Sequence, residues 1–568
     1  MKFDEFLFTH LGEFGRYQMI QFALICIPSM FVAMNSLSWT FTAANLPHRC
    51  RISDQEPLNS SYWTNSNQLH SISCNASDGL CRYETCRLGN ENKCPYGYLY
   101  DHSEIKNSAI SQWDIVCDRS VLKAIIQSLY YVGQMTGSFI FGVLGDRIGR
   151  KKVFFMSLVI LMASSALSAI APHWTLFGLL RLAIGLSHPG IFGVGVVLGT
   201  ELVGPSKRKI ALVLSCIFFS LGQVVLGLLA YHIRDYQVLQ LAISMPILIF
   251  ISYWWLIPES ARWLVSLKRY NEANEILQRA ANINKVNLPD KWWEQLDLIE
   301  GKKDEEKSKP KYGYMDLFKT PIIRKRILVS IYLWPVVSMV YYGVSMKTDF
   351  LGGDLYFTFI IGSISEIPAL LFLHFGADRI GRKPIFGGSY IVAAFCMLSN
   401  LLLPPDGNYR VYSFYFSLLK FVIKVFSVNI SNLQITVIAA HWSLSLLQFI
   451  FTKASITICY AAIYMITSEL FPTVIRNTAI GCCSTVARLG SISASYIAMW
   501  LVESVGSWAM VIPFGSCALI AGLLVFLIVP ETMGQALPET IEELECPESF
   551  NNKKEMSLIQ NFNKGNNA

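Results

Sequence analysis

Residues Gly142-Val-Leu-Gly-Asp-Arg-Ile-Gly-Arg-Lys-Lys152 lie between two apolar runs, 121–144 and 153–171. The four cationic side chains of this stretch cannot lie in hydrocarbon at a tolerable cost. The sequence therefore predicts a tight motif loop between two membrane helices, whose glycines permit a sharp turn and close helix approach. Because basic residues concentrate in cytoplasmic loops, we expect this loop on the cytoplasmic side.

A shortened copy of the motif occurs later, as Gly376-Ala-Asp-Arg-Ile-Gly-Arg-Lys383. Two further segment pairs match: Glu201-Leu-Val-Gly-Pro-Ser-Lys-Arg208 with Glu469-Leu-Phe-Pro-Thr-Val-Ile-Arg476, and Pro258-Glu-Ser260 with Pro530-Glu-Thr532. Repeated segments in the same order indicate that the chain consists of two copies of one membrane-spanning unit.

The composition is that of a membrane protein. Of the 568 residues 53% are hydrophobic and only 15% are charged, whereas a soluble domain carries about 25% charged residues. The mean hydropathy is +0.40. The net charge is +7, and the basic residues lie in short loops, as the positive-inside rule expects. The charge therefore does not indicate binding to nucleic acid. The first apolar run, 17–43, is too long for a signal peptide and is interpreted as the first helix.

The sequence thus predicts an all-α polytopic membrane protein with twelve transmembrane helices in two six-helix pseudo-repeats. We expect helices near 17–43, 121–144, 153–171, 174–202, 209–232, 238–257, 327–345, 355–375, 385–403, 479–502 and 510–529, and a tenth that carries Tyr460 and Tyr464. The predicted regions are a cytoplasmic N-terminus 1–16, a first half 17–257 with an outer loop 44–120, a cytoplasmic linker 258–326 with short helices, a second half 327–529, and a cytoplasmic tail 530–568.

The second half is longer than the repeat requires. Asp146 and Glu201 are 55 residues apart, whereas the matching Asp378 and Glu469 are 91 apart. The surplus of about 36 residues falls at about 405–441. A thirteenth span there would invert the helices that follow it, so we interpret the segment as an insertion on the membrane surface or as an error in the gene model.

Cysteines cluster in the outer loop. A zinc site or a disulfide frame would both use such a cluster, but a loop opposite the basic loops faces the outside, where disulfides persist. Three disulfides are expected, with fifteen possible pairings. The sequons at Asn59 and Asn75 predict glycosylation on the same side. The six cysteines are Cys50, Cys74, Cys81, Cys86, Cys94 and Cys117.

Charged residues inside apolar runs are the candidates for chemistry. Glu366 and Arg488 each lie several residues inside such a run, where they either pair with each other or face a substrate cavity. Arg181 is as much a candidate for scaffold as for site. Lys347 and Lys453 are interpreted as snorkelling residues near helix ends.

Aromatic residues share helix faces with these charges. Trp334 and Tyr341 are seven residues apart, and Tyr460 and Tyr464 are four apart. Such stripes are more often packing than a ligand site. Near a carboxylate they also suit an organic cation through cation–π contacts.

The chain resembles the organic cation/anion/carnitine transporter family of the major facilitator superfamily. The resemblance rests on the motif loops, the outer cysteines, Leu11-Gly-Glu-Phe-Gly-Arg-Tyr-Gln18, Gln112-Trp-Asp-Ile-Val-Cys-Asp118, Val340-Tyr-Tyr-Gly343 and Leu537-Pro-Glu-Thr540. Pro258-Glu-Ser-Ala-Arg-Trp-Leu264 departs from the usual pattern, with Ala261 where proline is common.

The resemblance implies a substrate site and a gate. Cation-selective members of the family resemble one another in having an aspartate at the position of Arg488. Anion-selective members have a lysine at the position of Leu370. One acid with a single base would suit a zwitterion such as a carnitine-like betaine. The implied substrate-binding residues are Trp334, Tyr341, Glu366, Tyr460, Tyr464 and Arg488. The implied gating residues are Gly142, Asp146, Arg147, Gly149, Arg150, Glu201, Asp378, Arg379, Arg382, Glu469 and Arg476.

The expected function is transport of small organic cations or zwitterions by alternating access. The alternatives are an organic anion transporter and, from another class, a receptor or scaffold that does not transport. The sequence shows no pattern of a nucleophile and a base that would predict an enzyme. We expect plasma-membrane placement with both termini cytoplasmic, the lipid bilayer and a small organic ion as partners, no nucleic acid, and neither cofactor nor metal; the sequence names no coupling ion.

Overall fold

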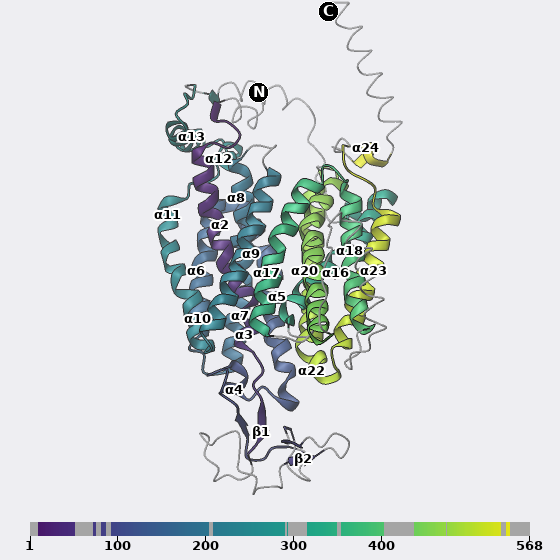
Figure 1. Cartoon of the computed structure of the whole chain (residues 1–568). Helices are drawn as coiled ribbons and strands as arrows, with labels where there is room; N and C mark the ends of the chain where they lie inside the picture. Colours follow the sequence, from purple (N-terminus) through teal and green to yellow (C-terminus); the bar gives the residue numbers. More distant parts are fainter. Residues whose placement is uncertain are drawn as a thin grey trace, which may run out of the picture.

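The computed structural model describes residues 10–51, 72–74, 81–83, 85–86, 93–203, 208–289, 292–293, 315–348, 354–402, 437–472, 474–534 and 541–545. Within this part of the chain, membrane-length helices form two bundles that stand side by side (Figure 1). The sequons at Asn59 and Asn75 and most of the predicted insertion at 405–441 lie outside the described residues.

The first half contains six helical spans, which confirms the predicted arrangement. They are α2 (Arg16–Leu37) with α3 (Trp39–Thr42), α5 (Val121–Ile148), α6 (Arg150–Ser168), α7 (Trp174–His188) with α8 (Val194–Leu202), α9 (Arg208–His232), and α10 (Tyr236–Ser244) with α11 (Tyr253–Leu256). A π-helical turn, Pro189–Gly193, separates α7 from α8. Proline has no backbone N–H and breaks the regular hydrogen-bond ladder at this point.

The second half repeats the pattern. Its spans are α16 (Pro321–Met346), α17 (Leu355–Gly376), α18 (Arg382–Ser399), α20 (Val437–Leu470), α21 (Arg476–Tyr496) with α22 (Val502–Val505), and α23 (Trp508–Ile528). Ten spans of the described chain are long and apolar enough to cross a membrane by composition alone. The other two, α5 and α18, end or begin in the charged motifs.

The motif loop is shorter than expected. The spacing predicts a loop over 142–152, but α5 continues through Ile148 and α6 begins at Arg150. Only Gly149 separates them, with a φ of 107° that favours glycine. A side chain at Gly142 would meet open space. The idea that Gly142 serves a turn or a close approach is therefore wrong, because the residue lies inside a helix.

The linker and the outer loop occupy opposite ends of the molecule (Figure 1). Two linker helices, α12 (Ala261–Ser266) and α13 (Tyr270–Asn284), lie beside the first half, and the predicted amphipathic stretch 272–281 is within α13. Short helices α15 (Asp316–Lys319) and α24 (Ile541–Glu545) lie at the same end of the second half. We call this end the motif side and the opposite end the loop side.

The loop side carries the only strands of the described chain. β1 (His48–Cys50) pairs antiparallel with β4 (Tyr98–Tyr100), and β2 (Ile72–Cys74) pairs with β3 (Cys81–Tyr83). This segment is joined to the first half: the Lys106 amide donates to the Arg234 carbonyl at 3.0 Å, and Trp113 Nε1 donates to the Pro172 carbonyl at 3.2 Å. A helix within it, α4 (Ala109–Trp113), is capped by Ser108.

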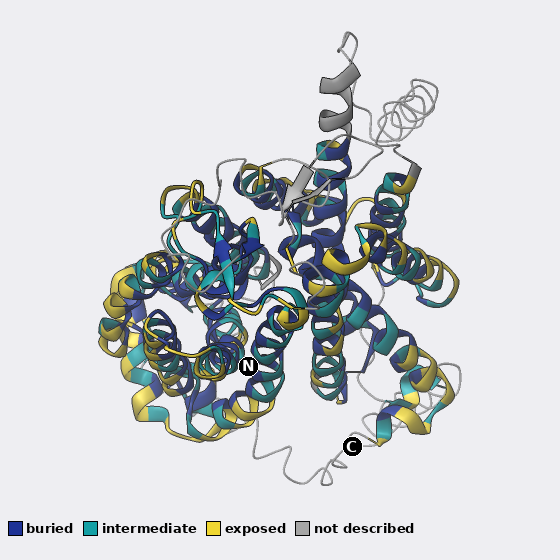
Figure 2. Cartoon of the chain, turned by 90° about the horizontal axis from the view of Figure 1, so that it is seen from below, coloured by how far each residue is buried: buried dark blue, intermediate teal, exposed yellow. Residues whose placement is uncertain are grey.

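Burial follows the membrane arrangement. Seen from the loop side, exposed residues gather on the outer rim and buried residues face the interior of each bundle (Figure 2). Large apolar side chains such as Leu179, Ile249, Trp255 and Leu527 are exposed. In a bilayer such side chains lie against lipid, so their exposure is consistent with a membrane-spanning protein.

Candidate functional site

A buried carboxylate lies where the two halves meet. Glu366 of α17 is 1% exposed, and its Oε1 receives a hydrogen bond from the Tyr341 hydroxyl at 3.0 Å. Oε1 is also 2.7 Å from the Lys453 ammonium of α20. Its Oε2 accepts from Ser220 and from Gln223 Nε2, the latter at 3.0 Å, and both donors belong to α9. A carboxylate offers about four acceptor sites, so all of them are used in this arrangement.

Lys453 corrects two sequence-based interpretations. The lysine does not snorkel to an interface: it is 2% exposed, pairs with Glu366 and donates to Ser345. Its ammonium also lies 4.0 Å from the centre of the Tyr341 ring. The idea that Glu366 and Arg488 pair with each other is wrong, because Lys453 takes that role. The chain therefore has two bases beside its one acid, rather than a single base.

Aromatic rings connect this ion pair to the other predicted site residues. The Tyr341 ring lies 5.0 Å from the Tyr460 ring, and the Trp334 and Tyr464 rings are 4.6 Å apart. Trp334 is anchored by a hydrogen bond from Nε1 to Thr467 at 3.1 Å. Tyr342 and Tyr131, which the sequence analysis did not single out, extend the row into the first half with a 5.0 Å ring contact.

Arg488 is a buried cation with few partners. Its side chain is only 6% exposed, and among the described residues its one hydrogen bond joins Nη1 to the Tyr460 hydroxyl oxygen at 3.5 Å. Its Nε has no hydrogen-bond partner in that part of the chain. A buried guanidinium is costly without an anion or further acceptors. The structure thus gathers all six predicted substrate-binding residues around one buried layer of the second half.

Arg181 belongs to the scaffold. Its guanidinium donates to the Asn35 carbonyl at 2.8 Å and to Gln127 Oε1 at 2.6 Å, and also contacts Ser38. These bonds join α7 to the first helical span and to α5. Since this arginine is bonded to neutral groups within one half, we assign it a structural role.

The loop side is closed by contacts between the halves. Lys123 of α5 pairs with Glu503 of α22 at 2.8 Å, and Asn45 donates to the same carboxylate at 2.7 Å. Farther along the interface, the Phe41 ring stacks on Tyr356 of α17 at 5.4 Å. No spacing pattern in the sequence indicates these partners, because they come from opposite halves.

The motif charges pair within their own halves instead. Arg150 lies 3.0 Å from Asp146 and 3.5 Å from Glu201, and Arg382 pairs with Asp378 and Glu469 in the same way. The side chain of Asp146 is 77% exposed and that of Asp378 is 60% exposed. The described contacts between the halves thus lie in the middle and on the loop side, while the motif charges pair within their own halves.

Two acids in the repeated Pro-Glu segments complete these networks and were missed as site residues. Glu259 accepts from the backbone amides of Arg150 and Lys151 at 2.9 and 3.0 Å, and Glu531 accepts from those of Arg382 and Lys383 at 3.1 Å each. Both cap the helix that follows Gly149 or its counterpart Gly381. The other predicted gating residues, Arg147, Arg379 and Arg476, lie at the same ends, the first two exposed and the third half-buried.

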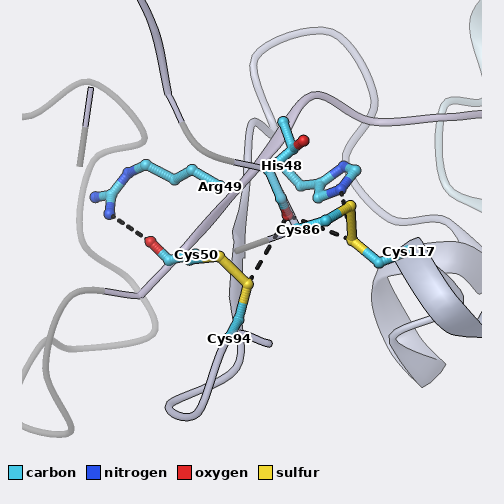
Figure 3. Close-up of a disulfide and its surroundings, with 7 residues drawn as sticks. His48, Arg49, Cys50, Cys86, Cys94 and Cys117 are labelled. Atoms are coloured by element: carbon cyan, nitrogen blue, oxygen red, sulfur yellow. Dashed lines mark hydrogen bonds between the residues drawn. A yellow bond between two sulfur atoms is a disulfide. The ribbon is translucent and has the colours of Figure 1, made fainter. Parts of the chain in front are cut away.

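Disulfides hold the segment on the loop side. Cys50 is bonded to Cys94, and Cys86 is bonded to Cys117 (Figure 3). Cys74 and Cys81 are opposite one another in the backbone register of β2 and β3, but their side chains lie outside the described residues. His48 lies beside the second disulfide. Because both of those sulfurs are bonded to each other, this trio does not offer the thiolates that a zinc site uses.

Comparison with known proteins identifies the family. Residues 90–544 match the family model described as sugar (and other) transporter. The chain belongs to this family. It is 36% identical over 560 residues to a Drosophila melanogaster protein named organic cation transporter protein, covering 96% of this chain and 95% of the relative. It is 29% identical to human organic cation/carnitine transporter 2, covering 94% of this chain and 92% of the relative. The resemblance found in the sequence is confirmed.

A solved structure supports the same fold. The inward-open xylose transporter XylE of E. coli aligns over 92% of this chain and 98% of its own, with a TM-score of 0.57 at 15% identity. Identity at this level shows only the fold. Family and fold together make the chain a multi-pass membrane transporter rather than an enzyme, working by alternating access between its two six-helix halves.

Proposed function

We propose that this transporter moves small zwitterions or cations of the carnitine-like betaine type, and that Arg488 binds the substrate carboxylate. The observation that carries the proposal is the buried guanidinium of Arg488, which has a single 3.5 Å hydrogen bond among the described residues. A carboxylate forms paired hydrogen bonds with such a fork. The curated relatives that match this chain are named for organic cations and carnitine, which supports the substrate class.

The charges of the central layer favour a substrate that carries a carboxylate. Glu366 and Lys453 neutralise one another at 2.7 Å, so Arg488 adds a positive charge that no acid of the described residues pairs with. A simple cation would meet this charge unfavourably. The carboxylate of a zwitterion offsets the charge of Arg488, and its cationic end can bind to other groups of the same layer.

The cationic end has aromatic partners. The rings of Tyr460 and Tyr464 lie near Arg488 and Trp334, and that of Tyr342 packs against Tyr460 at 6.2 Å. A quaternary ammonium is attracted to such ring faces. Glu366 is fully bonded in this conformation, so its part in the proposal is to balance Lys453 and to hold the Tyr341 hydroxyl.

We further propose the plasma membrane as the location, with the motif side and both termini in the cytoplasm. The basic motif loops and the disulfide-bonded segment lie at opposite ends, as the positive-inside rule and an oxidising exterior require. The contacts between the halves on the loop side then make the described state one that is closed to the outside.

The test is uptake of three labelled substrates, a betaine, a tetraalkylammonium and a dicarboxylate, in cells that express wild type, Arg488→Ala, Arg488→Lys or Arg488→Asp. We expect Arg488→Ala to lower apparent affinity for the betaine about ten- to a hundredfold, the effect of one lost charge-assisted contact of about 1.5–3 kcal/mol. Arg488→Lys keeps the charge but loses the fork, so we expect a smaller loss. Arg488→Asp should favour the tetraalkylammonium.

Surface protein is measured in every variant, so that a folding defect is separated from a binding defect. A parallel fall for all three substrates at equal surface protein would reject Arg488 as the carboxylate site. A second function, organic anion transport, is favoured by the net positive charge of the same three residues, Glu366, Lys453 and Arg488. Wild-type uptake of the dicarboxylate above that of the betaine would select it.

A further inference from the structure

The carboxylate of Glu366 is divided between the two halves of the transporter. Oε1 is bonded to Tyr341 and Lys453, which belong to α16 and α20 of the second half. Oε2 is bonded to Ser220 and Gln223, which belong to α9 of the first half. A buried charge thus joins two bodies that must change their relative position during transport.

Gln223 is oriented by this charge. Its Nε2 donates one hydrogen bond to Glu366 Oε2 and another to the Tyr341 hydroxyl, both at 3.0 Å. An amide nitrogen has two N–H donors, so both are used. The amide carbonyl has no hydrogen-bond partner among the described residues. Turning the amide over would place this oxygen against Glu366 Oε2, so the orientation follows from the role of Glu366 as the acceptor.

We propose that Gln223, with Ser220, is a positioning residue that holds α9 against the charged Glu366 and so favours the described state, in which the loop side is closed. The bonds exist only while the two halves are in their present relation, because the donors and the acceptor belong to different halves. The titratable groups that face the carboxylate are Lys453 of α20, Tyr341 of α16 and Cys216 of α9. Since Lys453 remains with Glu366 in the second half, the α9 donors are the partners that movement of the halves can remove.

This inference does not depend on the substrate. It requires only the two halves and the state described here, which is also held on the loop side by Lys123–Glu503 and Phe41–Tyr356. Loss of the α9 donors should therefore shift the balance between states without abolishing either one. A charge-assisted hydrogen bond is stronger than a neutral one, so the shift should be measurable.

Matched control residues lie in the same half. Ser215 is a buried serine of α9 whose hydroxyl contacts Cys26, and Gln240 is a buried glutamine that donates to Ser165 at 2.9 Å. Both make their contacts within the first half. Ser215→Ala and Gln240→Leu therefore remove the same chemistry without touching the junction.

The experiment measures the distance between spin labels on the motif side in the purified full-length transporter in nanodiscs. Labels are placed at exposed positions on the two halves, through Glu275→Cys on α13 and Lys325→Cys on α16. We expect Gln223→Leu, and more so Ser220→Ala with Gln223→Leu, to lower the ratio of long to short distances about tenfold. Ser215→Ala and Gln240→Leu should leave the ratio within about twofold of the wild type.

A second variant separates charge coupling from packing. Gln223→Glu places a carboxylate about 3 Å from Glu366, and two acids this close share a proton. The distance ratio of Gln223→Glu should therefore become steeply dependent on pH, relative to the wild type. Gln223→Met replaces Gln223→Leu where the latter does not fold, because methionine keeps the length of the side chain. An unchanged ratio in the Gln223 variants, or an equal shift in Gln240→Leu, overturns the proposal.

Discussion

The two halves are nearly alike on the motif side and unlike in the middle. On the motif side each half has the same arrangement of five residues. These are an exposed aspartate, a glycine at positive φ, an arginine, a glutamate near the end of the next helical span, and a capping glutamate from the Pro-Glu segment. In the middle, the first half has Arg181 bonded to neutral groups, whereas the second half has an acid and two bases.

The halves thus share the networks at their helix ends and differ in the central residues, which we propose as the substrate site. The shared networks join helix ends within each half. A duplicated scaffold needs such a network in both of its halves. Among the described residues, the central acid and the two bases near it belong to the second half, next to the tyrosine rings. A transporter needs one set of substrate contacts between its two bodies, so asymmetry is expected there.

The largest effect should come from breaking the asymmetric pair. Lys453→Met leaves Glu366 buried without its counter-ion, and loss of one partner of a buried pair costs about 3–5 kcal/mol. We expect much lower yield and thermal stability by size-exclusion chromatography after heating. Lys453→Met combined with Glu366→Gln should recover most of the stability; failure to recover would mean that Lys453 acts through packing alone.

An intermediate effect should come from the shared caps. Glu259→Gln and Glu531→Gln each weaken a helix N-terminal cap, which costs about 0.5–2 kcal/mol. The two changes should lower thermal stability by similar amounts if the halves are equivalent. Unequal losses would show that the likeness on the motif side is geometric but not energetic.

The Glu531 cap should also respond to pH. Partial burial raises the pKa of this carboxyl, but backbone N–H groups of Met533, Arg382, Lys383 and Thr532 together lower it below its ordinary value. A depressed folded-state pKa contributes stability above the unfolded pKa, and this is lost as pH falls through the folded pKa. The stability gap between wild type and Glu531→Gln should therefore shrink on acidification below the ordinary range of a glutamate.

The smallest effect on stability should come from Asp146→Asn. The aspartate is largely exposed, and such surface pairs contribute about 0–1 kcal/mol. We nevertheless expect transport to fall strongly, because we propose that the motif acts as a gate in the other state, when the motif side closes. Uptake normalised to surface protein measures this, with Asp378→Asn as its counterpart; normal turnover in Asp146→Asn would reject a gating role.

The sequence predicted the repeat and the site residues, but it did not predict most of the contacts that the site residues make. Matching segments identified Arg150, Glu201, Arg382 and Glu469 as residues of a repeated motif, but their pairing within each half became visible only in the structure. Lys453 was misplaced near a helix end, because the start of the tenth helix could not be located in the long apolar stretch; the lysine lies inside α20. Gln223 gave no signal, since a lone glutamine in an apolar run has no periodic partner. Tyr342 lay in a quoted motif, but its contact with Tyr131 depends on how two distant helices pack.

The disulfide-bonded segment on the loop side is joined by hydrogen bonds to the ends of helices in the first half, and it reaches the second half through Asn45 at Glu503. An antibody fragment that recognises β1 and β4 would thus travel with the first half as the transporter cycles. Such a fragment serves as an orientation marker in electron microscopy images of the small membrane protein. A fragment that also covers α22 would bind to both halves at once. It would inhibit transport because it would prevent the halves from moving relative to one another.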